Sequence, residues 1–396
     1  MATHGYKPAT KIGGPVVSVA ATAERLVERG HDVTILTSDS NLTERLSVDT
    51  SIRHEINGVK IWYNRTFNLT EAFGFSKKRR RLGYLYSFDL RKRAVECMQT
   101  ADIVHLQMPF VYPTYCAATE ARRQKVPYFY QQRGVFDPAR MRVRGIKKKV
   151  FFRLREAGVI DNAAGLIALT QQEVESYRGL GCRNEIYLIP NGIDVPEAEQ
   201  LVNSRTELSK FSLDPARSTI IFLGRVNSQK GVQILFDAFL LARKSRRDLQ
   251  LLIAGPDEDG IGQAVARQAH AGGVASDVKV IGHVDGIVKR RLLAESQLFC
   301  LPSNAEGFSM AVLESLAVGT PVLLTPGCNF QEVESAGVGE VVGRNVKELA
   351  AGLGRTAFVC DESDGNRQRV RDFVRKNYHW DKVTDSLEKA YEQALA

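Results

Sequence analysis

The sequence predicts an α/β protein built from two doubly wound domains, and three observations lead to this expectation. Short apolar runs alternate with helical patterns along the whole chain, which is typical of parallel sheets covered by helices. The chain has 396 residues, more than one hydrophobic core usually supports. Near its middle, Pro190-Asn191-Gly192 and a polar stretch to about residue 217 interrupt the alternation and indicate a domain boundary.

In the first half, apolar residues at helical spacing follow Pro15, and Gly30 ends the helix that they predict. The chain reaches the Gly13-Gly14 loop so early that the strand opening this domain is either a stub or begins upstream of Met1. The expected strands are 33–37, 59–63, 103–107, 128–131, 166–169 and 186–189, and the expected helices are 15–29, 87–99, 114–124 and 150–161.

The second half repeats the alternation with short apolar runs of the kind that form buried strands in a parallel sheet. The expected strands are 220–223, 249–254, 278–281, 298–301 and 322–324, and the expected helices are 233–244, 261–271, 287–295 and 310–318. We therefore expect an N-terminal domain over residues 1–190 with a truncated first strand, a C-terminal domain over residues 191–377, and a last helix over residues 378–396.

The composition is that of an ordinary globular protein, with 44% hydrophobic and 25% charged residues. No apolar run approaches the roughly 18 residues that indicate a membrane span. The N-terminus has neither the basic start nor the apolar stretch of a signal peptide. Six cysteines lie far apart without a Cys-x-x-Cys pair, which favours reduced thiols over disulfides or a zinc site. We expect a cytoplasmic protein, with association to the inner face of the membrane as a further option.

The net charge of +9 is unevenly distributed. Residues 1–190 contain 30 Lys and Arg against 18 Asp and Glu, whereas residues 191–396 contain 24 against 27. A basic half indicates an anionic partner, such as a membrane surface, a phosphorylated acceptor or nucleic acid. A solvated charged face is the alternative for any one cluster. The clusters are 77–81, 91–93 and 140–149.

The segment from Glu306 to Glu314 carries the clearest functional signal. It follows the predicted strand 298–301, and open α/β sheets bind ligands at the carboxyl ends of their strands. Gly307 permits a tight turn, and Ser309 can cap the helix that follows. The two carboxylates can accept hydrogen bonds from sugar or ribose hydroxyls. Taken alone, an unremarkable turn and a surface glutamate remain the competing interpretation.

Phosphate binding is expected beside these carboxylates. The first backbone N–H groups of the helix form an anion site, and they belong to Phe308, Ser309 and Met310. Arg225 ends the first strand of the second domain and Lys230 opens the next helix, so two cations should converge at a strand end. Such preorganised charge can stabilise a diphosphate leaving group. A basic surface loop is the alternative.

Other glycine loops are less informative. Lys11-Ile12-Gly13-Gly14-Pro15 opens a helix and provides a second weak anion site. The dinucleotide, Walker, zinc-protease and serine-hydrolase motifs are absent from the sequence.

Together these motifs resemble retaining glycosyltransferase family 4 (group 1 glycosyltransferases), of the type that acts in polysaccharide biosynthesis. They are Gly224-Arg225 with Lys230-Gly231, Glu306-x7-Glu314, Ala317-x-Gly319-x-Pro321-Val322 and Ile189-Pro190-Asn191-Gly192-Ile193-Asp194. The resemblance covers nearly the whole chain. It implies the GT-B fold, in which two Rossmann-like domains face a central cleft and the second domain binds a UDP- or GDP-linked sugar without a metal or other cofactor.

The resemblance also implies roles for individual residues. Arg225 and Lys230 would bind the donor diphosphate, Glu306 the donor sugar and Glu314 the ribose. Gly224 and Gly307 belong to the same donor-binding loops. Backbone amides of Phe308, Ser309 and Met310 would contact sugar and phosphate, Gly282, His283 and Val284 would lie against the base, and Gly14 would close on the phosphates. The helix after Trp380 would cross back to the first domain.

Three residues of the first half are candidate acceptor or sugar contacts. Family members often carry an active-site histidine two residues after His105, where this chain has Gln107. We expect strand alternation to point His105 away from the crevice, and a core histidine is the competing interpretation. Arg133 lies in an Arg-Gly-x-x-Asp-Pro segment and would bind acceptor or phosphate, unless it only holds its loop.

The predicted activity is transfer of a sugar, with retention, from a nucleotide sugar to a glycan or polyprenyl-diphosphate-linked acceptor in cell-surface polysaccharide biosynthesis. Three alternatives remain open: a sugar-nucleotide epimerase on the same fold, a basic nucleic-acid-binding protein, and a catalytically impaired relative. The paired glutamates argue against the epimerase. The nucleic-acid alternative leaves Arg225, Lys230 and both glutamates unexplained, so we expect no nucleic-acid partner.

Overall fold

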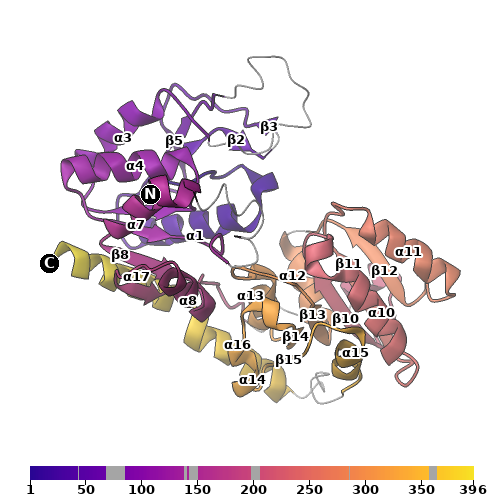
Figure 1. Cartoon of the computed structure of the whole chain (residues 1–396). Coiled ribbons are helices and arrows are strands. Elements are labelled where there is room, and N and C mark those ends of the chain that lie inside the picture. The colour runs from indigo at the N-terminus through magenta and orange to yellow at the C-terminus, as the bar shows by residue number, and fades with distance from the viewer. Residues whose placement is uncertain are drawn as a thin grey trace. The chain divides into compact units, whose positions relative to one another are not determined.

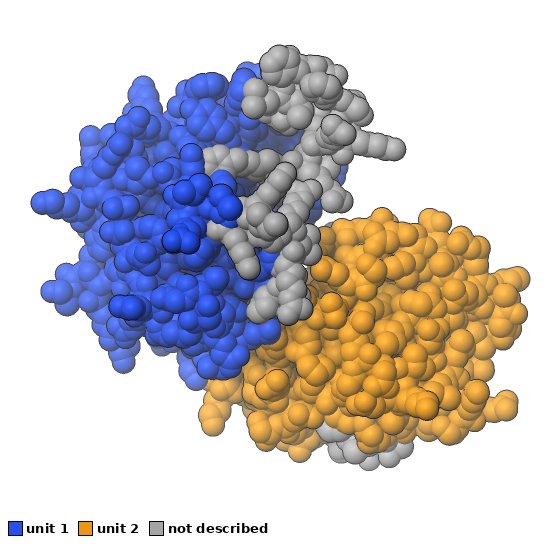
Figure 2. All heavy atoms as spheres, viewed as in Figure 1, with its two compact units in different colours: residues 1–192, 380–396 blue, residues 193–379 orange. Residues whose placement is uncertain are grey.

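The computed structural model of the protein describes residues 1–42, 44–67, 85–137, 141, 150–197, 206–284, 286–355 and 364–396. The chain divides into two compact units (Figure 2). Unit 1 comprises Met1–Gly192 and Trp380–Ala396, and unit 2 comprises Ile193–His379. No helix within the described ranges is long and apolar enough to cross a membrane.

Unit 1 contains two main groups of strands, of which the second is wholly parallel, and a separate two-stranded hairpin (Figure 1). The first group contains β1 (Thr34–Ser38), β5 (Val59–Asn64) and β4 (His54–Ile56), with β4 antiparallel to β5. The second contains β6 (Val104–Gln107), β7 (Tyr128–Gln131), β8 (Gly165–Ala168) and β9 (Ile186–Leu188). Ala2 forms parallel bridges to Leu36 of β1 and Leu106 of β6. The first residues of the sequence therefore lie between β1 and β6 and join the two groups.

The helices of unit 1 pack in two sets. One set contains α3 (Leu90–Met98), α4 (Tyr112–Gln124) and α7 (Ala157–Asp161), which continues the π-helix η3 (Phe152–Glu156). The other pairs α1 (Gly14–Glu28) with α17 (Trp380–Leu395). The smaller elements are η1 (Thr10–Ile12), β2 (Ser40–Asn41), β3 (Glu44–Arg45) and α8 (Gln171–Gly179).

Strand alternation divides the core of unit 1 into two clusters. Tyr128 and Tyr130 of β7 pack in the cluster that holds α3 and α4, whereas Phe129 packs in the cluster that holds α1 and α17. Successive side chains of a strand point to opposite faces, so a strand that is apolar throughout feeds both clusters. Both faces of β7 are therefore lined by aromatic residues up to Gln131 at its end.

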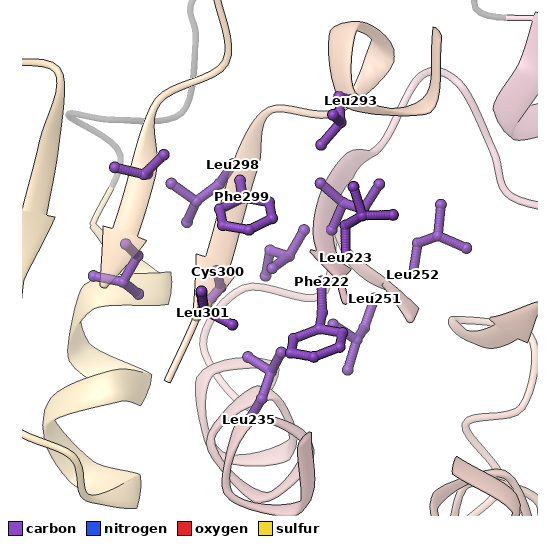
Figure 3. Close-up of a cluster of buried hydrophobic side chains, with 14 of the residues drawn as sticks. Phe222, Leu223, Leu235, Leu251, Leu252, Leu293, Leu298, Phe299, Cys300 and Leu301 are labelled. Atoms are coloured by element: carbon purple, nitrogen blue, oxygen red, sulfur yellow. The ribbon is translucent and has the colours of Figure 1, made fainter. Parts of the chain in front are cut away.

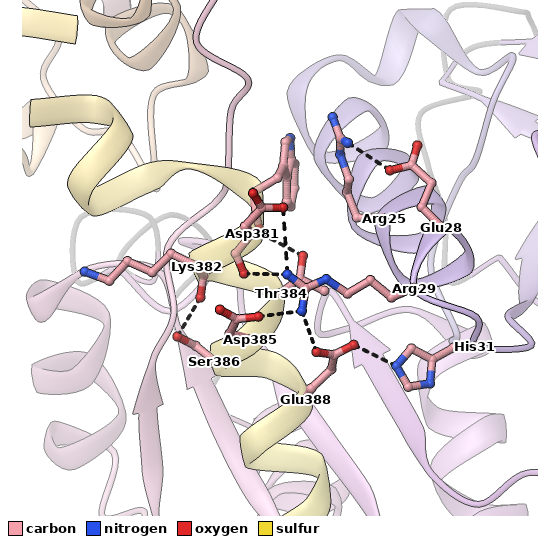
Figure 4. A network of polar contacts seen from close by, with 11 residues as sticks. Arg25, Glu28, Arg29, His31, Asp381, Lys382, Thr384, Asp385, Ser386 and Glu388 are labelled. Carbon is pink, nitrogen blue, oxygen red and sulfur yellow. Dashed lines mark hydrogen bonds and ion pairs between the residues drawn. The ribbon is translucent and has the colours of Figure 1, made fainter. Parts of the chain in front are cut away.

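Helix α17 closes the second cluster although it follows unit 2 in the sequence. Trp380, Val383 and Leu387 are buried there. Figure 4 shows Arg29, at the end of α1, reaching the acidic face of α17, where it pairs with Asp385 and lies 2.8 Å from Glu388. The chain leaves unit 1 after Gly192 and returns to it at Trp380, and these two residues are in contact. A Cβ on Gly192 would lie 2.5 Å from the Trp380 ring.

Unit 2 is a single parallel sheet of six strands around one hydrophobic core (Figure 3). In spatial order the strands are β12 (Val278–Gly282), β11 (Leu249–Ala254), β10 (Ser218–Leu223), β13 (Leu298–Leu301), β14 (Val322–Leu324) and β15 (Gly339–Val341). Every residue of β11 and β13 is buried, as the apolar runs predict. Figure 3 shows Phe222, Leu251 and Phe299 from three neighbouring strands within this core.

The helices of unit 2 also pack in two sets, as expected of a doubly wound sheet. One set contains α10 (Val232–Ala242), α11 (Ile261–Ala271) and α15 (Val346–Gly354). The other contains α9 (Thr206–Lys210), α12 (Gly286–Glu295), α13 (Met310–Ala317) and α16 (Asp364–Tyr378). The short elements are η5 (Ser228–Lys230), η6 (Pro326–Cys328) and α14 (Glu332–Ser335).

The expected α/β architecture is confirmed, and each expected strand and helix is present with ends within about three residues of those predicted. The elements not predicted from the sequence are the strands β2, β3, β4 and β15 and the helices α8, α9 and α14 to α16. These elements are short, or, like α16, carry strongly polar sequences in which apolar periodicity is weak.

Candidate functional site

The candidate donor-binding residues lie in unit 2, in loops at the carboxyl ends of neighbouring parallel strands. The loop after β10 carries Arg225 and Lys230, and the loop after the adjacent β13 carries Glu306. Because the strands are parallel, these loops emerge at the same edge of the sheet, where open α/β folds bind ligands. The topology therefore brings together residues that are about 80 positions apart in the sequence.

The loop after β10 has a fixed conformation. The Asn227 side chain caps η5 by accepting a hydrogen bond from the Lys230 backbone N–H at 3.1 Å. Gly231 then adopts a φ of +76°, and a Cβ there would lie 2.3 Å from the Pro302 carbonyl oxygen. Only glycine permits this close approach of the two loops. The glycine after Lys230 therefore holds the lysine next to the loop that follows β13.

Lys230 and Glu306 form an ion pair, with 2.6 Å between Nζ and Oε1. Both side chains are mostly buried, at 18% and 9% exposure. The Glu306 backbone N–H donates to the Gly327 carbonyl at 2.7 Å, and the Asn329 side-chain amide donates to the Glu306 carbonyl at 2.7 Å. Glu306 does not simply project from its loop: it is anchored through its backbone, and its carboxylate faces the lysine.

Arg225 is more accessible to solvent than Lys230, the other cation of the candidate site. Its side chain is 56% exposed, and its Nη1 lies 3.0 Å from Oε1 of Glu258, in the loop after β11. The other carboxylate oxygen of Glu258 accepts a hydrogen bond from the Asn227 side chain at 2.8 Å. Glu258 thus supplies a negative charge that faces Arg225.

Glu314 lies in the second turn of α13, where it pairs with Lys289 of α12 at 2.7 Å. Both side chains are partly exposed. Ser309 occupies the N-cap position of α13, but its side chain makes no capping hydrogen bond, so the expectation that it caps this helix is wrong. The first N–H groups of α13 therefore have no side-chain cap, and no acidic residue lies in the first turn.

The remaining predicted donor-site residues lie in loops of the same unit. The Phe308 ring packs on Phe330 with centroids 4.8 Å apart, and Met310 begins α13. This ring packing anchors the loop that carries Gly307. Gly224 directly follows β10, and His283 and Val284 directly follow β12.

In unit 1, Gly14 begins α1, and Gly13 before it has a φ of +88°. His105 and Gln107 are both buried at the end of β6, and their side chains lie 3.1 Å apart. Strand alternation does not separate the two side chains, because residues two positions apart on a strand share a face, and the expectation that His105 points away from the crevice stays a prediction. His105 instead contacts the Tyr391 hydroxyl of α17 at 2.7 Å, and burial is the main cause that lowers its pKa well below the usual value.

Arg133 follows β7 and is also buried. Its Nε donates to the Gln107 side-chain oxygen at 2.6 Å, and its Nη1 donates to Ser18 and Asn191. The structure therefore brings Arg133, Gln107 and His105 together in one polar network.

The basic clusters of the first half behave differently from one another. In the cluster 91–93, Arg91 pairs with Glu120 at 3.0 Å, and Arg93 donates to the Tyr63 carbonyl at 2.8 Å. Those two arginines thus hold unit 1 together. The cluster 77–81 and the cations of 140–149 lie outside the described residues.

Two family models match successive parts of the chain. The model described as Glycosyltransferase Family 4 matches residues 12–197, and the model described as Glycosyl transferases group 1 matches residues 217–357. The chain belongs to the family 4 (group 1) glycosyltransferases. The prediction made from the loops after β10 and β13 is therefore confirmed at the level of the family and of the GT-B fold.

Curated relatives of this glycosyltransferase include mannosyltransferases. It is 29% identical to the phosphatidyl-myo-inositol mannosyltransferase of Mycobacterium tuberculosis (strain H37Rv) over 52% of this chain and 53% of that protein. The match thus spans about half the length of that relative. It is 24% identical to the GDP-mannose:cellobiosyl-diphosphopolyprenol alpha-mannosyltransferase of Xanthomonas oryzae pv. oryzae, over 80% of this chain and 81% of that protein.

Solved structures share the fold along the whole chain. Anabaena HepE in complex with UDP superposes with a TM-score of 0.74 at 16% identity, covering 99% of this chain and 98% of that chain. The sucrose-phosphate synthase of Thermosynechococcus elongatus superposes with a TM-score of 0.70 at 17% identity, covering 96% and 93%.

Sequence reasoning missed the partners of the predicted residues. Glu258 and Lys289 were not singled out, although Asp257-Glu258-Asp259 follows a predicted strand just as the other candidate loops do. The rule that ligands bind at the carboxyl ends of strands was sufficient to find Glu258. Tyr391 gave no such signal, because its contact with His105 depends on how α17 docks.

Proposed function

We propose that this glycosyltransferase transfers a hexose from a UDP- or GDP-linked donor, with retention, to a glycan or polyprenyl-diphosphate-linked acceptor in cell-surface polysaccharide biosynthesis. The observation that carries the proposal is the meeting of Arg225, Lys230 and Glu306 at one edge of the sheet of unit 2. Two cations can bind a diphosphate through charge-assisted hydrogen bonds, and a carboxylate can accept hydrogen bonds from sugar hydroxyls.

The proposed step is a front-side displacement at the anomeric carbon. The acceptor oxygen forms a bond to this carbon while the bond to the β-phosphate oxygen breaks, and the leaving diphosphate takes the acceptor proton. Arg225 and Lys230 stabilise the charge that develops on the leaving group, and no metal or other cofactor is required in this scheme. Cys328, behind Glu306, is no candidate nucleophile, because burial raises the pKa of its thiol to about 11 and keeps it protonated at neutral pH.

The names of a relative and of a structural neighbour support the proposed nucleotide and the proposed acceptor class. One relative is named for GDP-mannose and a diphosphopolyprenol, and one structural neighbour was solved with UDP. The positive surplus of residues 1–190 suits an acceptor that carries phosphate at an anionic membrane. We therefore place the reaction at the cytoplasmic face of a membrane.

Lys230 provides the direct test. The Lys230→Ala variant should lose about 100-fold or more in turnover of UDP-glucose or GDP-mannose, because one preorganised cation contributes several kcal/mol to such a transition state. Release of UDP or GDP by purified protein measures this loss. Lys347→Ala is the matched control, since Lys347 is an exposed lysine of α15 in the same unit. Turnover of Lys230→Ala within about threefold of Lys347→Ala would refute the proposed role.

A further inference from the structure

The loop after β14, residues 325–330, lies against the loop after β13 that carries Glu306. Because β13 and β14 are neighbouring parallel strands, both loops emerge at the same edge of the sheet. The Glu306 backbone N–H donates to the Gly327 carbonyl at 2.7 Å, and the Asn329 side-chain amide donates to the Glu306 carbonyl at 2.7 Å. The loop after β14 therefore bonds both backbone polar groups of Glu306.

The loop after β13 is held closely on both sides. A Cβ on Gly327 would lie 2.4 Å from the Asn304 carbonyl oxygen, so only glycine permits this approach of the two loops. On the other side, the Asn304 backbone N–H donates at 2.8 Å to the carbonyl of Gln229, the residue before Lys230. The backbone that leads to Glu306 is therefore fixed between the loops of the two neighbouring strands, β10 and β14.

Asn329 combines two properties that glycine cannot combine. Its backbone is left-handed, with a φ of +59° and a ψ of +40°. Glycine adopts this conformation at the least cost, and asparagine is among the few other residues that tolerate it. The Glu306 carbonyl can only accept a hydrogen bond, so the nitrogen of the Asn329 amide must face it. Asparagine thus permits the turn and also supplies the donor.

The carboxylate of Glu306 has a partner of its own, because Oε1 lies 2.6 Å from Nζ of Lys230. In the proposed function, Lys230 turns to the donor diphosphate, and the Glu306 carboxylate is then released to accept hydrogen bonds from the sugar. A glutamate on a loosely held loop would follow the lysine. Because its backbone N–H and carbonyl are both bonded, Glu306 changes only the direction of its side chain.

We propose that Asn329 is a positioning residue for sugar transfer, which holds the Glu306 backbone so that the released carboxylate meets the donor sugar. The inference rests on the proposed function, in which Glu306 binds that sugar. Asn329 acts through Glu306 and needs no contact of its own with the donor. The loop after β14 thereby becomes part of the site, together with the loops after β10 and β13.

Asn329→Gly tests the inference, because it keeps the left-handed backbone and removes only the side-chain amide. Its kcat with UDP-glucose or GDP-mannose, whichever the parent turns over faster, should fall by about 10- to 100-fold, because a small misplacement at the reacting centre costs this much. The thermal shift caused by UDP or GDP should stay as in the parent, since neither carries the transferred sugar. Asn329→Asp serves if the glycine variant does not fold: it tolerates the same backbone, lacks the donor and should lose as much kcat.

Thr325→Val is the matched control in the same loop. The buried Thr325 hydroxyl donates to the Ser303 carbonyl at 2.7 Å, so this variant removes one hydrogen bond between the same two loops without touching Glu306. Thr325→Val and Asn329→Gly should each lower the melting temperature by about 2–4 °C. Only Asn329→Gly should lose turnover, and Thr325→Val should keep its kcat within about threefold of the parent. An equal loss of kcat in both would mean that the loop acts only through stability, and would overturn the positioning role.

A Glu306→Gln background separates this inference from the proposed function. In that background Asn329→Gly should change kcat by less than about threefold, because the carboxylate that it positions is gone, while its effect on the melting temperature should persist. A full further loss of kcat there would show that Asn329 does not act through Glu306. An active parent whose Asn329→Gly variant keeps normal turnover overturns the inference alone. A parent that turns over neither donor contradicts the proposed function, together with the inference that rests on it.

Discussion

At the scale of single residues, each charged group of the candidate donor site faces an opposite charge within the protein. Lys230 pairs with Glu306, Arg225 with Glu258, and Glu314 with Lys289. In these pairs each charge of the site is balanced by an opposite charge of the protein itself. A diphosphate must therefore replace or rearrange at least one internal carboxylate, and the exposed pair of Arg225 is the easiest to displace.

Glu258 is predicted to compete with the donor for Arg225. Glu258→Gln removes the carboxylate 3.0 Å from Nη1 and leaves an amide of the same size. Since exposed ion pairs contribute about 0.2–1 kcal/mol, the donor KM should fall by a factor of about 1.4 to 5 while kcat changes little. Initial rates over a range of donor concentrations measure both constants.

The matched control for this prediction is Asp259→Asn. It removes the same charge from the same loop, but Asp259 accepts a hydrogen bond from the Ser228 backbone and does not pair with Arg225. An equal fall in KM for both variants would mean that the loop acts through its net charge, and that the Arg225–Glu258 pair has no special role.

At the scale of helices and strands, the elements that the sequence predicted share one physical property. Strand β13 is apolar throughout, β11 is apolar except for Gln250, and α1 repeats its apolar residues with helical spacing. Burial therefore determines the pattern of apolar residues in these elements. Helix α16 is rich in charged and amide side chains, and β4 lies in a partly exposed hairpin, so neither shows that pattern. Those elements depend on tertiary contacts.

The candidate site could be predicted only in part, because some of its features also depend on tertiary contacts. The loops after β10 and β13 could be placed at one edge of the sheet from the sequence, because the carboxyl ends of parallel strands meet at the same edge. The burial of Glu306 and the neutral partners of Arg133 depend on side-chain packing between distant segments. The contact of His105 with Gln107 was not expected, because strand alternation was applied to residues that share a face.

Helix α17 gives a prediction at this scale. Leu387→Ala should destabilise the protein by about 2–5 kcal/mol, because Leu387 is buried in the core cluster of unit 1. Glu388→Gln is the matched neighbour: its carboxylate pairs with Arg29 and His31 near the surface (Figure 4), so its removal should cost much less. Urea unfolding followed by circular dichroism measures both. Equal costs would show that α17 is held mainly by its ion pairs.

At the scale of the whole molecule, positive charge and candidate donor chemistry lie in different halves of the chain. Residues 1–190 contain 30 cations against 18 anions, whereas the candidate donor site belongs to unit 2. A positive surplus near an anionic bilayer contributes about 1 kcal/mol for each Lys or Arg close to the surface, and salt screens it. An enzyme with a lipid-linked acceptor gains from this attraction because the acceptor is confined to the membrane.

The resulting prediction concerns vesicle binding. The protein should co-sediment with vesicles that contain anionic lipid at low salt, and should release at about 0.5 M NaCl, where the Debye length falls to about 4 Å. Neutral vesicles should not bind. Replacing the five cations of 77–81 by glutamine should weaken binding at least tenfold, because several kcal/mol of attraction are removed.

The control for vesicle binding removes the same charge from unit 2. It replaces five exposed cations by glutamine, namely Lys244, Arg247, Arg267, Arg290 and Lys347. If attraction is local to the basic half, this control should bind anionic vesicles nearly as well as the parent, since its changes lie in the half without a positive surplus. Equal loss in both variants would instead mean that only the net charge of the molecule matters, and the proposed membrane contact through the N-terminal half would then be wrong.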